Sequence, residues 1–135
     1  MKRNIIITVD SSIKQDGFVH INQISSIINY SCDSIILDCL EYLQEKDHAV
    51  VFNVLLEKLR PTGRLVVSIS NAKDIANNFV NATISSGDFL RFFINKQSLL
   101  SIESIYTFID FKHYDILTLD TDDTSITIVI ERKNI

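Results

Sequence analysis

Apolar residues occur along this chain in short runs that have the length of β-strands. The first run, residues 5–9, is wholly β-branched, which is typical of a buried strand. The run at 34–39 is nearly continuous and predicts a strand that is buried on both of its faces. Only residues 121–124 separate the last two runs, as in an antiparallel hairpin. In chain order, the predicted strands are residues 5–9, 18–22, 34–39, 64–70, 114–120 and 125–131.

Other segments place their apolar residues three and four positions apart, which predicts amphipathic helices packed on a sheet. Leu55 belongs to such a stripe in the first helix, and Ile75 to the stripe of the second. The stretch that begins at Gly87 is rich in aromatic residues and is expected to be irregular. The expected helices are 48–60 with Asp47 as N-cap, 72–80 with Asn71 as N-cap, and 98–109 with Ser98 as N-cap.

The order of these elements predicts the fold class. From residue 34 onwards, strands and helices alternate, which favours an α/β, Rossmann-like fold with a mainly parallel sheet covered by helices. The closing hairpin adds antiparallel strands at one side of that sheet. The centre of the sheet is expected at the two most apolar runs, 34–39 and 64–70. With 135 residues, we expect one domain spanning 1–135.

Composition and charge exclude several classes of function. The net charge is −4 and no basic cluster is longer than a pair, so a direct nucleic-acid partner is not expected. No apolar stretch approaches the roughly 20 residues of a membrane helix, and no membrane association is expected. Cys32 and Cys39 form no zinc-binding motif, so no metal site is predicted. Two reduced, buried cysteines are typical of a cytoplasmic protein, and the Ile/Asn/Ser/Asp-rich composition suits a bacterial or phage source.

One motif links the chain to a known family. Residues 56–72 read LEKLRPTGRLVVSISNA and join a helix end, a turn and a strand start in one register. This stretch resembles the LxxL(K/R)PGGxL motif, followed by two hydrophobic residues and SxPN, of class I S-adenosylmethionine-dependent methyltransferases. Thr62 stands where the family has its first glycine, and Ser70 stands where it has proline.

The resemblance extends over the second part of the chain. Residues 32–43 are similar to the family's fourth strand and the LEHL sequence after it, with Tyr42 in place of histidine. Residues 98–133 resemble the family's closing helix and strands. The similarity implies a truncated class I methyltransferase fold, in which 32–135 is the second half and 1–31 is an abridged form of the half that holds the cofactor.

The first 31 residues depart from the family pattern. The family implies a glycine-rich loop after the first strand and an acidic residue at the end of the second. Here the loop 10–17 has one glycine, and the second predicted strand ends in Asn22-Gln23, without charge. A parallel crossover usually needs a dozen residues or more, so these two strands are expected to form a hairpin or a distorted remnant. The remaining candidates for cofactor binding are Asp10, Ser11, Asn22 and Gln23.

Few residues are candidates for chemistry. Asp38 and Glu41 follow the third predicted strand, where this fold class places its active sites, and are the candidate catalytic residues. Asp10 is equally interpretable as a turn residue, and Glu41 as the start of a solvated helical turn. His20 is expected to be a surface or hydrogen-bonded histidine, and Cys39 has no basic neighbour to activate it. The aromatic stretch 89–94 covers substrate in related folds, but a packed edge or a protein contact is an equal alternative.

Two functions from different classes remain open. The first is a degenerate methyltransferase-like pseudoenzyme that needs no cofactor and acts as a binding or structural module, with a protein partner or a homo-oligomer. The alternative is an active methyltransferase with an abridged or partner-completed site, for which S-adenosylmethionine would be the cofactor. Methyl transfer depends mainly on positioning, so the lack of a strong general base does not exclude it. The loss of the glycine loop favours the first reading.

Overall fold

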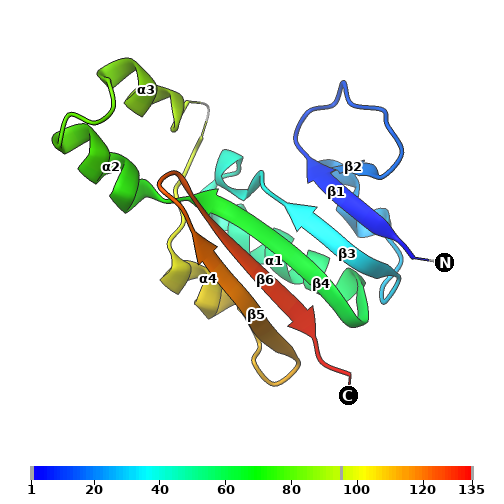
Figure 1. Cartoon of the computed structure of the whole chain (residues 1–135). Coiled ribbons are helices and arrows are strands. Elements are labelled where there is room, and N and C mark those ends of the chain that lie inside the picture. Colours follow the sequence, from blue (N-terminus) through cyan, green and yellow to red (C-terminus); the bar gives the residue numbers. More distant parts are fainter. Residues whose placement is uncertain (1, 95, 135) are drawn as a thin grey trace.

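The computed structural model describes residues 2–94 and 96–134. Its strands form one six-stranded sheet in the order β2-β1-β3-β4-β6-β5 (Figure 1). The first four strands run in parallel, β6 is antiparallel to β4, and β5 is antiparallel to β6. The strands are β1 (Asn4–Thr8), β2 (Phe18–His20), β3 (Cys32–Leu37), β4 (Leu59–Ser70), β5 (Tyr114–Thr121) and β6 (Ser125–Arg132).

Both 3₁₀ helices and α-helices connect these strands. Two short 3₁₀ helices follow β2 and β3, and the α-helices come after them in the chain (Figure 1). They are η1 (Ile21–Ser26), η2 (Leu40–Tyr42), α1 (Glu45–Lys58), α2 (Ala72–Val80), α3 (Ser86–Arg91) and α4 (Ile102–Phe108). The mainly parallel sheet with a closing antiparallel hairpin, and the central position of β3 and β4, confirm the sequence prediction.

The connection from β1 to β2 is a parallel crossover without a helix, so the predicted hairpin is wrong. Ile6 lies opposite Phe18, and Thr8 lies opposite His20. The short connection suffices because only three residues of β2 pair with β1, so the chain returns over only about 10 Å. Gly17 makes the sharp return, with a φ of 87°, and its carbonyl accepts a hydrogen bond of 2.7 Å from the Ile6 N–H.

The passage from α1 to β4 is tighter than predicted. The helix starts after Gln44, so Asp47 lies in its first turn and is not the N-cap. Leu59, predicted to be helical, is the first residue of β4 and pairs with Cys32. A Cβ on Gly63 would lie 2.7 Å from the Cys32 carbonyl oxygen. Glycine is therefore required at this position because the two backbones approach so closely.

Two further expectations about helices are corrected. Ser101, and not Ser98, caps α4, because its side chain accepts the N–H of Ser104. Ser98 instead donates to the carbonyl of Leu43 at 3.2 Å, and its hydroxyl lies 3.0 Å from Nε2 of His48. The stretch after Gly87, expected to be irregular, begins with the short helix α3. Local capping patterns thus fixed α2, which Asn71 caps as predicted, but misplaced the start of α4.

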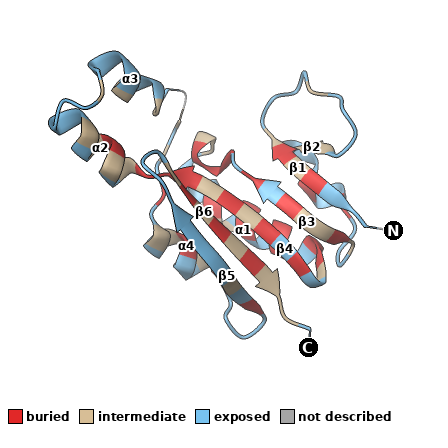
Figure 2. Cartoon of the chain, in the orientation of Figure 1, coloured by how far each residue is buried: buried red, intermediate tan, exposed pale blue. Residues whose placement is uncertain are grey.

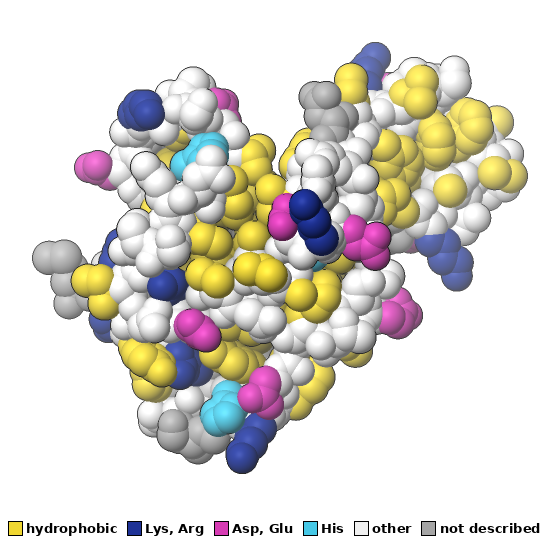
Figure 3. Space-filling model, turned by 180° about the vertical axis from the view of Figure 1, so that it is seen from behind, with side chains coloured by type: hydrophobic (Ala, Val, Ile, Leu, Met, Phe, Trp, Pro, Cys, Tyr) yellow, Lys and Arg dark blue, Asp and Glu magenta, His cyan; other side chains and the backbone are white. Residues whose placement is uncertain are grey.

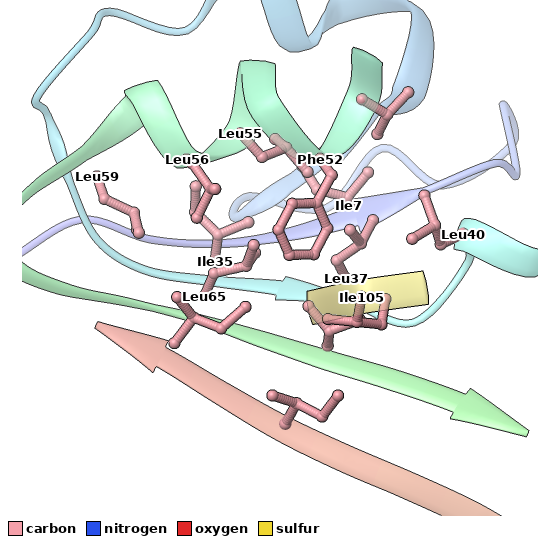
Figure 4. Packing of buried hydrophobic residues seen from close by; sticks show 14 of the residues in the cluster. Ile7, Ile35, Leu37, Leu40, Phe52, Leu55, Leu56, Leu59, Leu65 and Ile105 are labelled. Carbon is pink, nitrogen blue, oxygen red and sulfur yellow. The ribbon is translucent and has the colours of Figure 1, made fainter. Parts of the chain in front are cut away.

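The hydrophobic core lies between the sheet and the helices on one of its faces. Phe52 and Leu55 of α1 point toward Ile35 and Leu37 of β3, and Ile105 of α4 closes the layer beside β4 (Figure 4). All five side chains are fully buried. Because α1 and α4 both pack on this face, the core has a single layer of helices (Figure 1).

The opposite face of the sheet carries no helix in the described part of the chain, and this corrects the expectation that the central strands are buried on both faces. Buried residues alternate along the strands with partly or fully exposed ones (Figure 2). Ile36, the last residue but one of β3, keeps 38% of its surface exposed. We call this surface of the sheet the open face.

Helices α2 and α3 project beyond the end of the sheet (Figure 1). Stacking of Phe79 on Phe89, with ring centroids 4.6 Å apart, joins the two helices. Of the predicted stripe on α2 only Ile75 is buried, whereas Val80 is 78% exposed. The stripe therefore faces α3 more than the sheet, and we call the segment 72–94 the helical arm.

Candidate functional site

The carboxyl ends of β1, β2, β3 and β4 meet at one edge of the sheet, where this class of fold binds its ligands. After β1 the chain forms β2 on one side, and β3 then pairs on the other side of β1. The reversal of direction between β1 and β3 is the position at which open α/β sheets form a crevice. Every candidate site residue predicted from the sequence lies in a segment that follows β1, β2 or β3.

A hollow of about 630 Å³ lies beside the carboxyl ends of β1 and β2. Three of the four candidate cofactor residues line it, namely Ser11, Asn22 and Gln23. The structure thus brings together residues from the first loop and from η1. Its full lining consists of Ser11, Ile13, Lys14, Gln15, Asp16, Gly17, Phe18, His20, Asn22 and Gln23.

Asp10, the fourth candidate, is engaged within its own loop and does not line this hollow. Its Oδ1 accepts hydrogen bonds from the Ser12 hydroxyl at 2.6 Å and from the Ser12 N–H at 2.9 Å. These two bonds hold the pKa of Asp10 below its usual value, the hydroxyl having the larger effect. This is the geometry of a turn-forming aspartate, which favours the turn interpretation over a role in cofactor binding.

His20 marks the true end of the second strand, two residues earlier than predicted. Its Nδ1 accepts the N–H of Asn22 at 3.1 Å and so caps η1, while Nε2 lies 3.2 Å from the carbonyl oxygen of Val9. Because Nδ1 accepts, the proton is on Nε2, which donates to Val9. Asn22 and Gln23 therefore do not end a strand; they lie exposed on η1.

Glu41 is the most buried charged residue of the site, with 3% of its surface exposed. One carboxylate oxygen accepts the N–H and the hydroxyl of Ser70, at 2.9 and 2.7 Å. The other oxygen accepts the N–H of Leu100 at 2.9 Å. The carboxylate thus joins the end of β4 to the segment that leads into α4, and each of its two oxygens accepts at least one hydrogen bond. Sequence reasoning placed Glu41 in a solvated turn or in catalysis, and its burial shows that the turn is not solvated.

Lys96 completes this cluster and was not identified from the sequence. Its ammonium nitrogen lies 3.5 Å from a Glu41 carboxylate oxygen and donates to the Ser70 hydroxyl. It also lies 5.9 Å from the ring centre of Tyr42. No local pattern marks a lysine in the irregular segment after α3, so only the tertiary structure reveals it.

A small cavity of about 140 Å³ opens beside this cluster. Asp38, the other candidate catalytic residue, lines it together with Glu41 and Lys96. Asp38 is exposed, and it is the carboxylate here that remains open to solvent. The two candidate catalytic residues therefore share one cavity, but they differ in burial and in their contacts.

The thiol of Cys39 is unsuited to nucleophilic chemistry. It is 4% exposed, and burial, assisted by the nearby charge of Asp38, raises its pKa to about 11. The thiolate is the reactive form, and this pKa keeps it scarce near neutral pH. Within residues 2–94 and 96–134, no group of three or more His, Cys, Asp or Glu side chains is arranged to hold a metal ion.

The site does not fit S-adenosylmethionine in the way that the family resemblance implies. Residues 9–17, all of which the structure describes, form no helix, so no helix N-terminus follows β1 to face the cofactor. Gly17, the one glycine of this loop, is used for the return into β2. The residue at the end of β2, where the family resemblance implies an acidic side chain, is His20. The acidic residue that lines the hollow is Asp16, which lies in the loop before β2.

Several solved structures with a similar backbone are described as methyltransferases. The chain is similar to a SAM-dependent (S-adenosylmethionine-dependent) methyltransferase from Archaeoglobus fulgidus, with a TM-score of 0.62 and 8% identity, over 94% of this chain and 75% of that one. A second, from Mesorhizobium loti, gives a TM-score of 0.59 at 10% identity, over 96% of this chain and 81% of that one. An O-methyltransferase family protein from Burkholderia thailandensis gives 0.58 at 14% identity, over 87% of this chain and 36% of that one.

These likenesses establish the fold, which is that of class I S-adenosylmethionine-dependent methyltransferases, as the motif at 56–72 predicted. The chain spans between 36% and 81% of the lengths of the three proteins. The sequence itself matches no protein-family model and no curated protein. In the described residues, no helix has both the length and the apolar character needed to cross a membrane.

Proposed function

We propose that this chain is a binding module with a methyltransferase fold, and that it lacks the standard binding site for S-adenosylmethionine. The observation that carries the proposal is the first crossover. At the place where the fold holds its cofactor, residues 9–17 form an exposed loop without a helix. The carboxylate of Asp10 accepts its hydrogen bonds from Ser12 of the same loop. The helix N-terminus that the family resemblance implies is therefore absent from residues 9–17, and the Asp10 carboxylate is already hydrogen-bonded within the loop.

The Glu41 cluster supports the same proposal. A catalytic carboxylate must reach a substrate, but both oxygens of Glu41 already accept hydrogen bonds, from Ser70 and Leu100, and Lys96 forms an ion pair with it. A buried carboxylate with these partners stabilises the structure around it. The cluster holds the strand ends together, as a scaffold for binding requires.

The alternative function is methyl transfer at an abridged or partner-completed site. The hollow of about 630 Å³ favours it, because it lies at the carboxyl ends of β1 and β2 and brings Ser11, Asn22 and Gln23 together. A second chain that covered this hollow would supply the contacts that the loop 9–17 lacks.

Calorimetric titration of the full chain with S-adenosylmethionine separates the two functions. The binding module gives no saturable heat at micromolar ligand. Saturable binding that Asn22→Ala and Gln23→Ala weaken, while Asp123→Ala in the turn between β5 and β6 does not, would support the abridged enzyme. The Asp123 variant is the matched control because it removes an exposed polar side chain outside the hollow.

A further inference from the structure

Basic side chains gather at the edge of the sheet that lies opposite the candidate site. We call it the amino edge, because β1, β3 and β4 begin there, while the antiparallel β6 ends there (Figure 1). Seen from behind, Lys and Arg side chains are spread along this edge with hydrophobic side chains between them, at the lower left of Figure 3. The amino edge consists of residues 2–4, 28–34, 57–64, 110–115 and 131–134.

The amino edge is positive, whereas the rest of the molecule is negative. Its basic residues are Lys2, Arg3, Lys58, Arg60, Arg64, Lys112, Arg132 and Lys133, and its acidic residues are Asp33, Glu57, Asp110, Asp115 and Glu131. These eight cations and five carboxylates give a net charge of +3, within a chain whose net charge is −4. Three of the carboxylates pair with Lys or Arg inside the edge, at 3.2 to 3.6 Å, so the positive excess is what remains after pairing.

The turn that joins η1 to β3 collects arginines from distant parts of the chain. Arg3, from before β1, donates to the Ser31 hydroxyl at 3.3 Å, and Arg60 of β4 donates to the Ser31 carbonyl at 3.5 Å. Arg132 of β6 stacks on Tyr30, with its guanidinium carbon 4.1 Å from the ring centre. Of the three, only Arg60 forms an ion pair with a described carboxylate. Cations gathered in this way repel each other, so the arrangement favours an anionic partner.

Apolar side chains project from the same edge. Ile28 is 70% exposed and Tyr30 is 57% exposed, in the turn that the arginines surround, and Phe111 is exposed beside Lys112. Tyr30 has a φ of 62°, in the left-handed region that residues other than glycine seldom adopt, and its N–H donates to the Glu57 carbonyl at 3.1 Å. Exposed apolar and aromatic side chains among Lys and Arg are typical of surfaces that enter the lipid headgroup region.

We propose that the amino edge binds the surface of a membrane that contains anionic lipids. Ile28, Tyr30 and Phe111 enter the headgroup region, and the surrounding Lys and Arg side chains meet the lipid phosphates and carboxylates. The proposal rests on the binding function proposed above and names its partner. The negative remainder of the molecule then faces away from the membrane, so the carboxyl ends of the strands and the helical arm remain open to solvent.

Two other anionic partners fit this edge less well. A nucleic-acid strand is bound along a basic groove, but the hollow of about 310 Å³ at this edge is lined by Glu57 and Asp110 as well as by Arg132. The acidic end of a second copy would make a head-to-tail contact, which leaves both ends of the assembly open. The sequence expectation of no membrane contact rested on runs of neighbouring residues, whereas folding brings these side chains together from separate segments.

Co-sedimentation of the full chain with vesicles tests the proposal. Vesicles of phosphatidylcholine with about 30% phosphatidylserine should bind the chain at least about tenfold more strongly than phosphatidylcholine vesicles, and added salt should weaken this binding. Lys2→Gln and Lys112→Gln should each weaken it about fivefold, because each removes one cation near the membrane. Lys46→Gln, which removes an exposed cation at the start of α1, is the matched control and should leave binding within about twofold.

A second set of measurements tests the apolar contact. Ile28→Ser should weaken binding to the phosphatidylserine vesicles about fivefold or more, whereas Val80→Ser, at an exposed position on the helical arm, should leave it within about twofold. In the unsubstituted chain, nitroxide-labelled lipid in bicelles should broaden the methyl signals of Ile28 and not those of Val80. This NMR measurement requires no variant to fold.

Four results would overturn the proposal. Equal or absent binding to the two kinds of vesicle would remove the membrane as partner, as would broadening confined to the helical arm. Tighter binding of a single-stranded oligonucleotide than of the vesicles would assign the edge to nucleic acid. Self-association in sedimentation that Lys2→Gln and Lys112→Gln reverse would assign it to a second copy.

These outcomes are independent of the S-adenosylmethionine titration. Absence of vesicle binding removes the membrane as partner without giving the chain a cofactor. Binding of the cofactor overturns the binding module while leaving the vesicle result standing.

Discussion

The carboxylate of Glu41, just after β3, accepts both the backbone N–H and the hydroxyl of Ser70 at the end of β4, at 2.9 and 2.7 Å. The two residues lie 29 positions apart in the chain. Through its other oxygen, Glu41 also accepts the N–H of Leu100, so one side chain fixes two strand ends and the entry to α4. The cluster therefore stabilises the edge of the sheet at which this fold places its site.

Replacing Glu41 by glutamine tests this role. The amide nitrogen cannot accept the hydrogen bonds that the carboxylate accepts, and Lys96 loses its ion pair. We expect Glu41→Gln to lower the free energy of unfolding by about 2–4 kcal/mol. Urea denaturation measures the loss, and Glu45→Gln on the exposed start of α1 should change stability by less than about 0.5 kcal/mol. Equal stability of the two variants would show that the cluster is not structural.

Two fully buried helix residues give a second prediction. Leu55 on α1 and Ile75 on α2 are 0% and 1% exposed. Leu55→Ala and Ile75→Ala should each destabilise the protein by about 2–5 kcal/mol, because each leaves a cavity in a packed interior. Val50→Ala, at a position that is 62% exposed on α1, is the control. Losses below about 0.5 kcal/mol at both buried positions would contradict the packing described here.

The turn between β5 and β6 gives a pH dependence. Asp122 accepts the N–H groups of Thr124 and Ser125 at 2.8 and 2.7 Å, and these bonds hold its pKa below the ordinary value of 3.8. A carboxyl whose pKa is lowered by folding stabilises the folded state above its unfolded pKa, and this contribution is lost as pH falls through the folded pKa.

Thermal melts of Asp122→Asn should therefore start below those of the unsubstituted chain at neutral pH, and the difference in Tm should shrink as pH falls below 3.8. Asp123→Asn is the control, because it removes the same charge from the neighbouring position. A Tm difference that is independent of pH, or equal in both variants, would show that the hydrogen bonds to ionised Asp122 do not stabilise the turn.

Much of the sheet was predictable because local sequence determines it. The continuous apolar runs at β3 and β4 mark central strands, and the motif at 56–72 carries the fold resemblance in residues close together in the chain. The same is true of the Asn71 cap of α2, which depends on a side chain and an N–H three positions apart.

The site itself was less predictable, because contacts between distant residues determine it. The burial of Glu41 depends on Ser70, Lys96 and Leu100, and its own neighbours in sequence carry no sign of it. Strand periodicity cannot tell a helix-covered face from an open one, so Ile36 was expected to be buried. The parallel pairing of β1 with β2 was missed because a three-residue strand needs a far shorter return than a full crossover.

The central claim is that this protein has the methyltransferase fold but lacks the standard cofactor-binding site. Calorimetric titration with S-adenosylmethionine tests this claim most directly. The account predicts no saturable heat at micromolar ligand and at best millimolar affinity, a binding free energy of only about −4 kcal/mol. Saturable micromolar binding would contradict the claim, and substitutions at the candidate residues would then show where the cofactor binds. Loss with Asp10→Ala would place the cofactor at the first loop, whereas loss with changes at Asp38 or Glu41 would place it at the end of β3.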